Sequence, residues 1–115
     1  MIAAKTANRR ESTRRKARTS VLLTCRIGAL GMGPNISRSV LDISDTGVRL
    51  VVRKELVLPM EVEISITSYG MRQPILRLAE VRWQVELADG AFCVGIEFHK
   101  RLSYRDWQTL AAPNG

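Results

Sequence analysis

The sequence predicts a mainly β fold: a six-stranded antiparallel β-barrel that carries a short C-terminal α-helix and follows a flexible basic N-terminal arm. Apolar and polar residues alternate in six short runs, turn-forming residues separate those runs, and helical spacing of apolar residues begins only after Leu102. A chain of 115 residues suffices for one domain with a single core. We therefore expect three segments: the arm (1–18), the barrel with its helix (19–111) and a tail (112–115).

The first run, at 19–27, places Val21, Leu23 and Cys25 on one face and polar residues on the other, as a half-buried strand does. A loop with three glycines follows at 28–34. Similar β-rich runs recur at 39–43, 47–52, 60–67, 75–87 and 91–98. Because the connections are short and contain no helix, we expect antiparallel pairing, and closure into a barrel would remove the exposed edges.

Two connections have the composition of tight hairpins. Asp45, Thr46 and Gly47 join the second and third runs, and we expect Gly47 to adopt a positive φ. Asp89 and Gly90 join the last two runs and form a two-residue turn signal.

The end of the chain follows helical rather than strand spacing. Ser103 is a suitable N-cap, with Asp106 three residues later in the capping-box position. Tyr104 and Trp107 begin an apolar stripe at helical spacing, so Trp107 is expected in the core. Trp83, a large aromatic within a strand, is expected in the core as well, and the alternative is that it faces the ligand or a partner.

The positive charge of the chain is concentrated at its beginning. Residues 1–18 contain seven basic side chains and one acidic, a net charge of +6, whereas the rest contains eleven basic and ten acidic, a net charge of +1. The arm has too few large apolar residues to offset its ordering entropy by burial, so we expect it to be flexible. A flexible basic arm is suited to binding anions.

Several function classes find little support in the sequence. No apolar run approaches the roughly 20 residues of a membrane-spanning helix, and no signal-peptide pattern is present, so a cytoplasmic location is expected. Cys25 and Cys93 are expected to be buried, reduced thiols. His99 is the only histidine, so we expect neither a metal site nor a cofactor, and no enzyme activity.

Two short motifs instead describe a binding site for a guanine nucleotide. Arg14 and Arg18 stand four residues apart before the first strand, and guanidinium groups bind phosphate or the O6 and N7 atoms of guanine. Asp42 and Ser44 lie on one face of a strand, where they can accept the N1 and N2 hydrogens of guanine. Gly47 would allow close approach of a ligand or of backbone.

These two stretches, "RRKAR" and "DISDTG", resemble the Arg-x-x-x-Arg and Asp/Asn-x-Ser-x-x-Gly signatures of the PilZ domain family, and "AEVRW" and "VGIEF" resemble its late strands. The resemblance covers roughly residues 9–111. It implies an antiparallel β-barrel that acts as a receptor for the bacterial second messenger cyclic di-GMP, in signalling of the kind that controls motility or biofilm formation. It also implies that arginines hold guanine and phosphate while the acidic turn holds the other guanine edge; the ligand-binding residues would be Arg14, Arg18, Asp42, Ser44 and Gly47.

The register of the arginine pair has an alternative. Arg10 stands four residues before Arg14, so the pair could be Arg10 with Arg14, but we favour Arg14 with Arg18 because this pair is nearer to the first strand. Arg10 and Arg15 are expected to be further ligand contacts.

We expect a stand-alone adaptor in which the ligand clamps the mobile arm over the barrel and creates a surface for a downstream effector protein. The protein would be a monomer or a weak dimer. An alternative is a small barrel that binds single-stranded nucleic acid through its arm; aromatic residues are only 5% of the chain, and Asp42 would repel a polyanion. A third reading is purely structural, with Asp42 and Ser44 satisfying turn amides.

Overall fold

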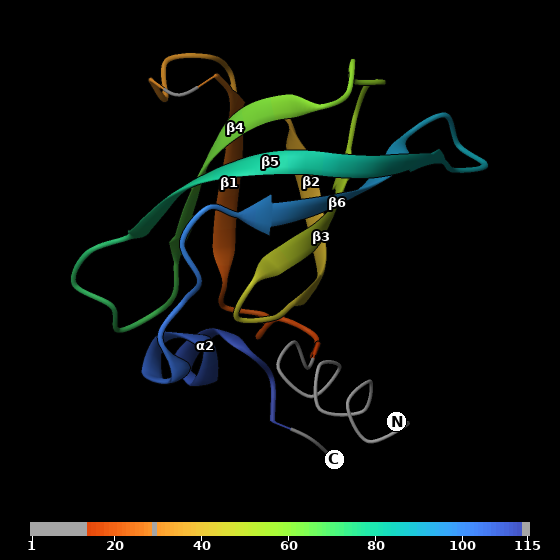
Figure 1. Cartoon of the computed structure of the whole chain (residues 1–115). Coiled ribbons are helices and arrows are strands. Elements are labelled where there is room, and N and C mark those ends of the chain that lie inside the picture. The colour runs from red at the N-terminus through yellow and green to blue at the C-terminus, as the bar shows by residue number, and fades with distance from the viewer. Residues whose placement is uncertain (1–13, 29, 114–115) are drawn as a thin grey trace, which may run out of the picture.

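The structure is a computed structural model and describes residues 14–28 and 30–113. Within these residues, the fold consists of six strands and a short helix, labelled as in Figure 1. They are β1 (Leu22–Ile27), β2 (Ser37–Ile43), β3 (Gly47–Val52), β4 (Met60–Thr67), β5 (Ile75–Glu86), β6 (Phe92–Phe98) and α2 (Tyr104–Leu110). The prediction of a mainly β fold with six antiparallel strands and a C-terminal helix is confirmed.

The strands form one antiparallel sheet in the order β1-β4-β5-β6-β3-β2, curled into a half-barrel (Figure 1). β1 and β2 therefore lie at the two edges. These edges meet where the end of β1 approaches the residues before β2: Arg26 and Asn35 form a backbone bridge, and the Ile36 amide donates to the Cys25 carbonyl at 2.8 Å. The first strand begins at Leu22 rather than at 19, because residues 19–20 form a turn closed by the Val21 amide and the Arg18 carbonyl at 3.0 Å.

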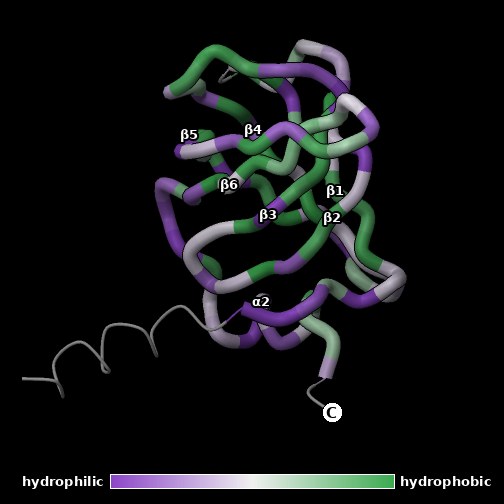
Figure 2. Tube along the Cα trace, turned by 90° about the vertical axis from the view of Figure 1, so that its right-hand side faces the viewer, coloured by the Kyte–Doolittle hydropathy of each residue, from purple (hydrophilic) through white to green (hydrophobic). Residues whose placement is uncertain are grey.

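The inner face of the curled sheet holds the hydrophobic core. β4 shows the alternation most clearly, because Val62, Ile64 and Ile66 are fully buried while the residues between them are partly exposed. In Figure 2, apolar stretches accordingly follow the strands, and polar stretches lie mainly in the connections. Helix α2 covers one end of the half-barrel and inserts Leu110 into the core (Figure 1).

Helix α2 begins as predicted. The Ser103 side chain accepts a hydrogen bond from the Asp106 amide at 3.1 Å, which caps the N-terminus. Trp107 packs against the core and donates its indole N–H to the Ile43 carbonyl at 3.2 Å, which confirms its predicted core position. Within residues 14–28 and 30–113, no helix is long and apolar enough to cross a membrane.

The core assignment of Trp83 was wrong. The residue is 40% exposed on the outer face of β5. The register with β6 shifts between Val81 and Trp83, so that Val81 opposes the buried Ile96 and Trp83 opposes Gly95. One extra residue in β5 reverses the side-chain alternation and directs Trp83 outward.

Two turn predictions had different outcomes. Gly90 adopts a positive φ of 87°, as expected for the second residue of its hairpin. Gly47 does not adopt a positive φ, so that prediction was wrong. Glycine is required at position 47 because there is no room for a side chain, since a Cβ there would lie 2.2 Å from the Ile96 carbonyl oxygen on β6.

Both cysteines are free thiols; Cys25 is buried and Cys93 is half-buried.

Candidate functional site

The residues just before β1 are fixed to the domain by backbone hydrogen bonds. Arg15 and Ile43 exchange two bonds, at 3.0 and 2.8 Å. The Arg18 amide donates to the Leu110 carbonyl at 2.9 Å, and the Lys16 carbonyl accepts from the Ala112 amide at 2.6 Å. Residues 15–18, which were predicted to belong to a flexible arm, thus lie between the end of β2 and the end of α2. Residues 1–13 of that predicted arm are outside the described part of the chain.

These bonds bring Arg14 next to the acidic turn. Arg14 Nη1 donates to Asp42 Oδ1 at 3.2 Å, which joins two motifs that are 28 residues apart. Asp42 is nearly buried, and its second oxygen, Oδ2, accepts from Arg49 Nε at 2.7 Å and from Arg49 Nη2. The hydrogen bond to Asp42 raises the pKa of Arg49. The carboxylate of Asp42 is therefore paired with two guanidinium groups.

Ser44 has a structural role within the turn. It is fully buried, and its hydroxyl oxygen accepts from the Thr46 and Gly47 amides, both at 3.2 Å. The Ser44 amide closes the turn by donating to the Gly47 carbonyl at 2.9 Å. Ser44 therefore satisfies turn amides, as the purely structural alternative predicted. Asp42 does not follow that alternative, because it accepts hydrogen bonds from arginines.

The other predicted arginines lie elsewhere. Arg18 Nε donates to the Thr109 carbonyl at 2.9 Å, at the C-terminal end of α2. The Arg15 guanidinium lies over the Trp107 ring, 4.3 Å from its centroid, and donates to Gln108 Oε1 at 3.1 Å. The structure therefore brings Arg14 to Asp42 but directs Arg15 and Arg18 to α2. Arg10 is outside the described residues.

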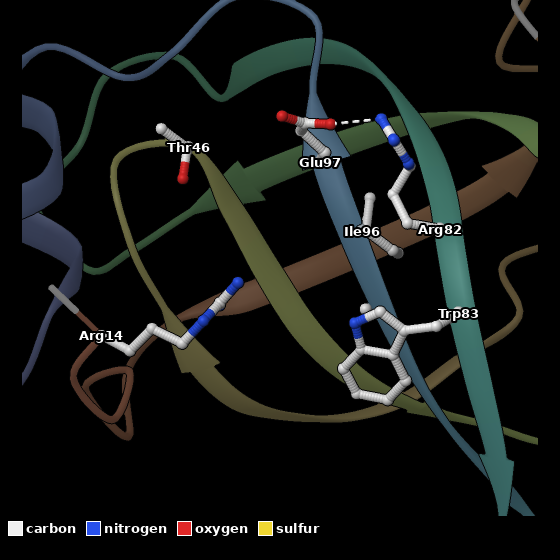
Figure 3. Close-up of a pocket in the computed structure, with 7 residues that line it drawn as sticks. Arg14, Thr46, Arg82, Trp83, Ile96 and Glu97 are labelled. Atoms are coloured by element: carbon white, nitrogen blue, oxygen red, sulfur yellow. Dashed lines mark hydrogen bonds and ion pairs between the residues drawn. The ribbon is translucent and has the colours of Figure 1, made fainter. Parts of the chain in front are cut away.

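A shallow pocket of about 280 Å³ lies on the outer face of the sheet beside this ion pair. Figure 3 shows the Arg14 guanidinium and the Trp83 indole pointing toward one another across β3. On the same side of the pocket as Trp83, Arg82 of β5 donates to Glu97 of β6 at 2.5 Å (Figure 3). The pocket is lined by Arg14, Thr46, Arg82, Trp83, Gly95, Ile96 and Glu97.

The floor of the site follows from the strand register. Trp83 opposes Gly95, Gly95 opposes Arg49, and Arg49 opposes Asp42, so these four residues form one row across β5, β6, β3 and β2. A Cβ at Gly95 would lie 2.2 Å from the indole of Trp83. Glycine therefore allows the indole to lie flat over β6.

Sequence reasoning did not assign Arg49, Gly95 or Trp83 to the site. No local pattern indicates that they share a row, because the row depends on how four strands align. The arrangement offers a carboxylate acceptor, guanidinium donors and an aromatic face within one open site. Within the described ranges, no three His, Cys, Asp or Glu side chains gather in a way that could hold a metal ion.

Comparison with known proteins bears on the whole chain. The PilZ domain family model matches residues 8–112. No curated protein and no solved structure gives a match. Because the family match covers nearly all of the sequence and the fold has six antiparallel strands and a terminal helix, the chain belongs to the PilZ domain family, a family of cyclic di-GMP-binding domains.

Proposed function

We propose that this protein is a bacterial receptor for cyclic di-GMP, a binding module rather than a catalyst, that passes on its bound state through contact with another protein. The observation that carries the proposal is the meeting of Arg14 and Asp42 at 3.2 Å beside a pocket that Trp83 lines. A guanine nucleotide offers anionic phosphates, N–H donors and an aromatic face. Guanidinium, carboxylate and indole groups are the complementary partners.

Each residue of the site has a distinct role in the proposal. Asp42 accepts the N–H groups on the Watson–Crick edge of guanine, Arg14 leaves Asp42 for a phosphate or for the Hoogsteen edge, and Trp83 stacks on a base. Ser44 and Gly47 act indirectly, since Ser44 closes the turn that follows Asp42 and Gly47 lets that turn pack against β6.

We further propose that Arg10 and Arg14 are the arginine pair of the motif. The sequence analysis gave this pair as the alternative to Arg14 with Arg18. The position of Arg18 supports it, because the Arg18 guanidinium donates to the Thr109 and Gln108 carbonyls of α2 and not toward Asp42. Arg15, which stacks on Trp107, has a similar role at α2. Arg15 and Arg18 would then hold the helix rather than the ligand.

Ligand binding would order the part of the arm that precedes Arg14 over the outer face of the sheet and so create the surface that an effector protein recognises. Residues 15–18 already have backbone partners, so the change would concern residues closer to the N-terminus. Hydrogen exchange of residues 8–14 should slow when cyclic di-GMP is added. Equal exchange rates with and without saturating ligand would contradict this ordering step.

The binding proposal is tested by calorimetric titration with cyclic di-GMP. We expect saturable binding to the unmodified protein and a loss of at least about tenfold in affinity for Arg14→Ala and for Asp42→Ala, because each removes a charge-assisted contact. Arg18→Ala is the matched control from the same basic stretch, and its affinity should stay within about threefold of the unmodified protein. A large loss for Arg18→Ala and none for Arg14→Ala would overturn the assigned register.

Competition separates the receptor from a nucleic-acid binder. GTP and a short single-stranded RNA are added to the complex at near-physiological salt. Retention of cyclic di-GMP supports the receptor. No binding of the nucleotide, together with salt-sensitive RNA binding, would show that the arm binds polyanions in general.

A further inference from the structure

Arg49 lies next to the proposed site but outside both sequence motifs. It is on β3, directly opposite Asp42 on β2, and its guanidinium donates through Nε at 2.7 Å and through Nη2 to the same oxygen, Asp42 Oδ2. The cross-strand register thus delivers a two-donor contact to the carboxylate.

This contact determines which acceptor positions of the Asp42 carboxylate remain for a ligand. A carboxylate oxygen has about two lone-pair positions, and two N–H groups of Arg49 use those of Oδ2. Among the described residues, one donor reaches Oδ1, namely Arg14 at 3.2 Å. A ligand with N–H donors therefore meets Oδ1.

The two arginines hold Asp42 in different ways. Arg49 uses two donors and extends from the middle of a paired strand, whereas Arg14 uses one longer bond and stands at the root of the N-terminal segment. The Asp42 side chain is only 11% exposed, so it has little solvent to take the place of a lost partner. Arg14 is the partner that a ligand can displace, and Arg49 is the partner that stays.

We propose that Arg49 is a positioning residue that fixes the Asp42 carboxylate with Oδ1 directed to the ligand and thereby sets the preference of the site for guanine. This inference rests on the proposed cyclic di-GMP-binding function. With Oδ2 occupied, Oδ1 accepts both the N1–H and the N2–H of one guanine edge. A base that lacks the 2-amino group loses one of these two bonds.

Removing Arg49 would change the competition at Asp42. The carboxylate could then rotate, and Arg14 could engage both of its oxygens with its own fork of N–H donors. The ligand would have to break a stronger internal ion pair, and it would meet a carboxylate with no fixed orientation. Affinity and base preference should both fall.

The test compares cyclic di-GMP with cyclic di-IMP, whose hypoxanthine bases lack only the 2-amino group. Both are titrated into the unmodified protein, Arg49→Met and Arg49→Lys. Arg53→Met is the matched control, because Arg53 follows the same strand and donates to the Ser37 carbonyl rather than to Asp42. Thermal unfolding of each variant without ligand shows whether it is folded.

We expect the unmodified protein and Arg53→Met to prefer cyclic di-GMP by about tenfold or more, the effect of the one charge-assisted hydrogen bond that a guanine 2-amino group donates to Asp42. Arg49→Met should bind cyclic di-GMP about tenfold more weakly, with the preference reduced to within about threefold. Arg49→Lys, which retains the charge without the fork, should show an intermediate preference.

The outcomes separate this inference from the proposed function. If Arg49→Met weakens both ligands equally and keeps the preference, Arg49 has only a structural role and the inference is wrong while the receptor stands. An unchanged affinity for Arg49→Met leads to the same conclusion. If the unmodified protein binds neither ligand, the proposed function fails and this inference fails with it.

Discussion

At the scale of single residues, the site depends on missing side chains as much as on those present. Gly47 and Gly95 both lie where a neighbour occupies the space of a Cβ, at 2.2 Å in each case. The neighbours differ in kind. Gly47 faces the Ile96 carbonyl within a paired strand, whereas Gly95 faces the ring of Trp83, which is 40% exposed and can change its rotamer. A methyl group at Gly95 would therefore act on the pocket more than on the fold.

We predict that Gly95→Ala lowers the affinity for cyclic di-GMP by about tenfold, through loss of a stacking surface, while the free energy of unfolding falls by less than about 1 kcal/mol. The added methyl group would push the indole off β6. Calorimetric titration and urea unfolding measure the two quantities. Gly33→Ala is the control, because its Cβ would meet nothing closer than 3.5 Å. Equal affinities for Gly95→Ala and Gly33→Ala would show that Trp83 does not contact the ligand.

At the scale of elements, α2 and the acidic turn are connected through β2. Trp107 of α2 donates to the Ile43 carbonyl, and Ile43 also pairs with Arg15. The Leu102 amide, which precedes the helix, donates to the Asp45 carbonyl at 2.7 Å. The helix has only seven residues, so its position depends on these contacts and on its cap rather than on intrinsic helical stability.

Ser103→Ala should therefore destabilise the protein by about 1 kcal/mol, because the Asp106 amide loses its acceptor. Urea unfolding followed by tryptophan fluorescence measures this change. Ser103→Asp, which keeps an acceptor at the N-cap, should stay close to the unmodified protein. If both variants lose the same stability, the cap is not the cause.

At the scale of the whole molecule, stability is coupled to a thiol in the core. Cys25 is fully buried, and burial raises the pKa of its thiol from 9.0 to about 12. Above pH 9.0 the unfolded chain loses this proton while the folded chain keeps it. Unfolding then releases a proton, so a rise in pH favours the unfolded state. The contribution of Cys25 is complete below pH 9.0 and is lost as the pH rises toward about 12.

We predict that the free energy of unfolding of the unmodified protein falls more steeply with pH than that of Cys25→Ala. The difference in slope should approach about 1.4 kcal/mol per pH unit in the alkaline range. Urea unfolding at a series of pH values above 9.0 measures both slopes. The lysines and tyrosines are the same in both proteins, so their titration cancels in the comparison. Parallel curves would show that the Cys25 thiol ionises as readily in the folded state as in the unfolded one.

Local patterns predicted the strands well, because alternation reports burial within a few residues. Strand β4 has the bounds that were predicted for it, and helix α2 begins directly after its predicted N-cap, Ser103. The predicted core position of Trp83 was wrong because a single extra residue in β5 reverses the alternation of side chains, and nothing in the local sequence marks that shift. The predicted positive φ of Gly47 was wrong because Ser44 closes the turn, which needs no positive φ at that position.

The arrangement of the candidate site could be predicted only in part, for a related reason. Arg14 and Asp42 belong to motifs that can be found by reading along the chain. Arg49 joins them through register alone, and Arg18 leaves them because the chain turns toward α2 immediately before β1. Arg49 is only seven residues from Asp42, but the β2–β3 register shifts between Val40 and Asp42, so spacing alone does not place them opposite one another. The contact of Arg18 joins segments 91 residues apart, which spacing does not encode.

The pairing of Ala17 with Ala111, next to the bonds of Lys16 and Arg18, brings two segments near the ends of the described chain side by side. A domain with adjacent ends can be spliced into a surface loop of a larger host protein without forcing the two cut ends of the host apart. Arg15, which pairs with Ile43, lies two residues before Ala17. A host joined near this pairing would be attached close to the proposed nucleotide site, which would suit this domain to building fused sensors.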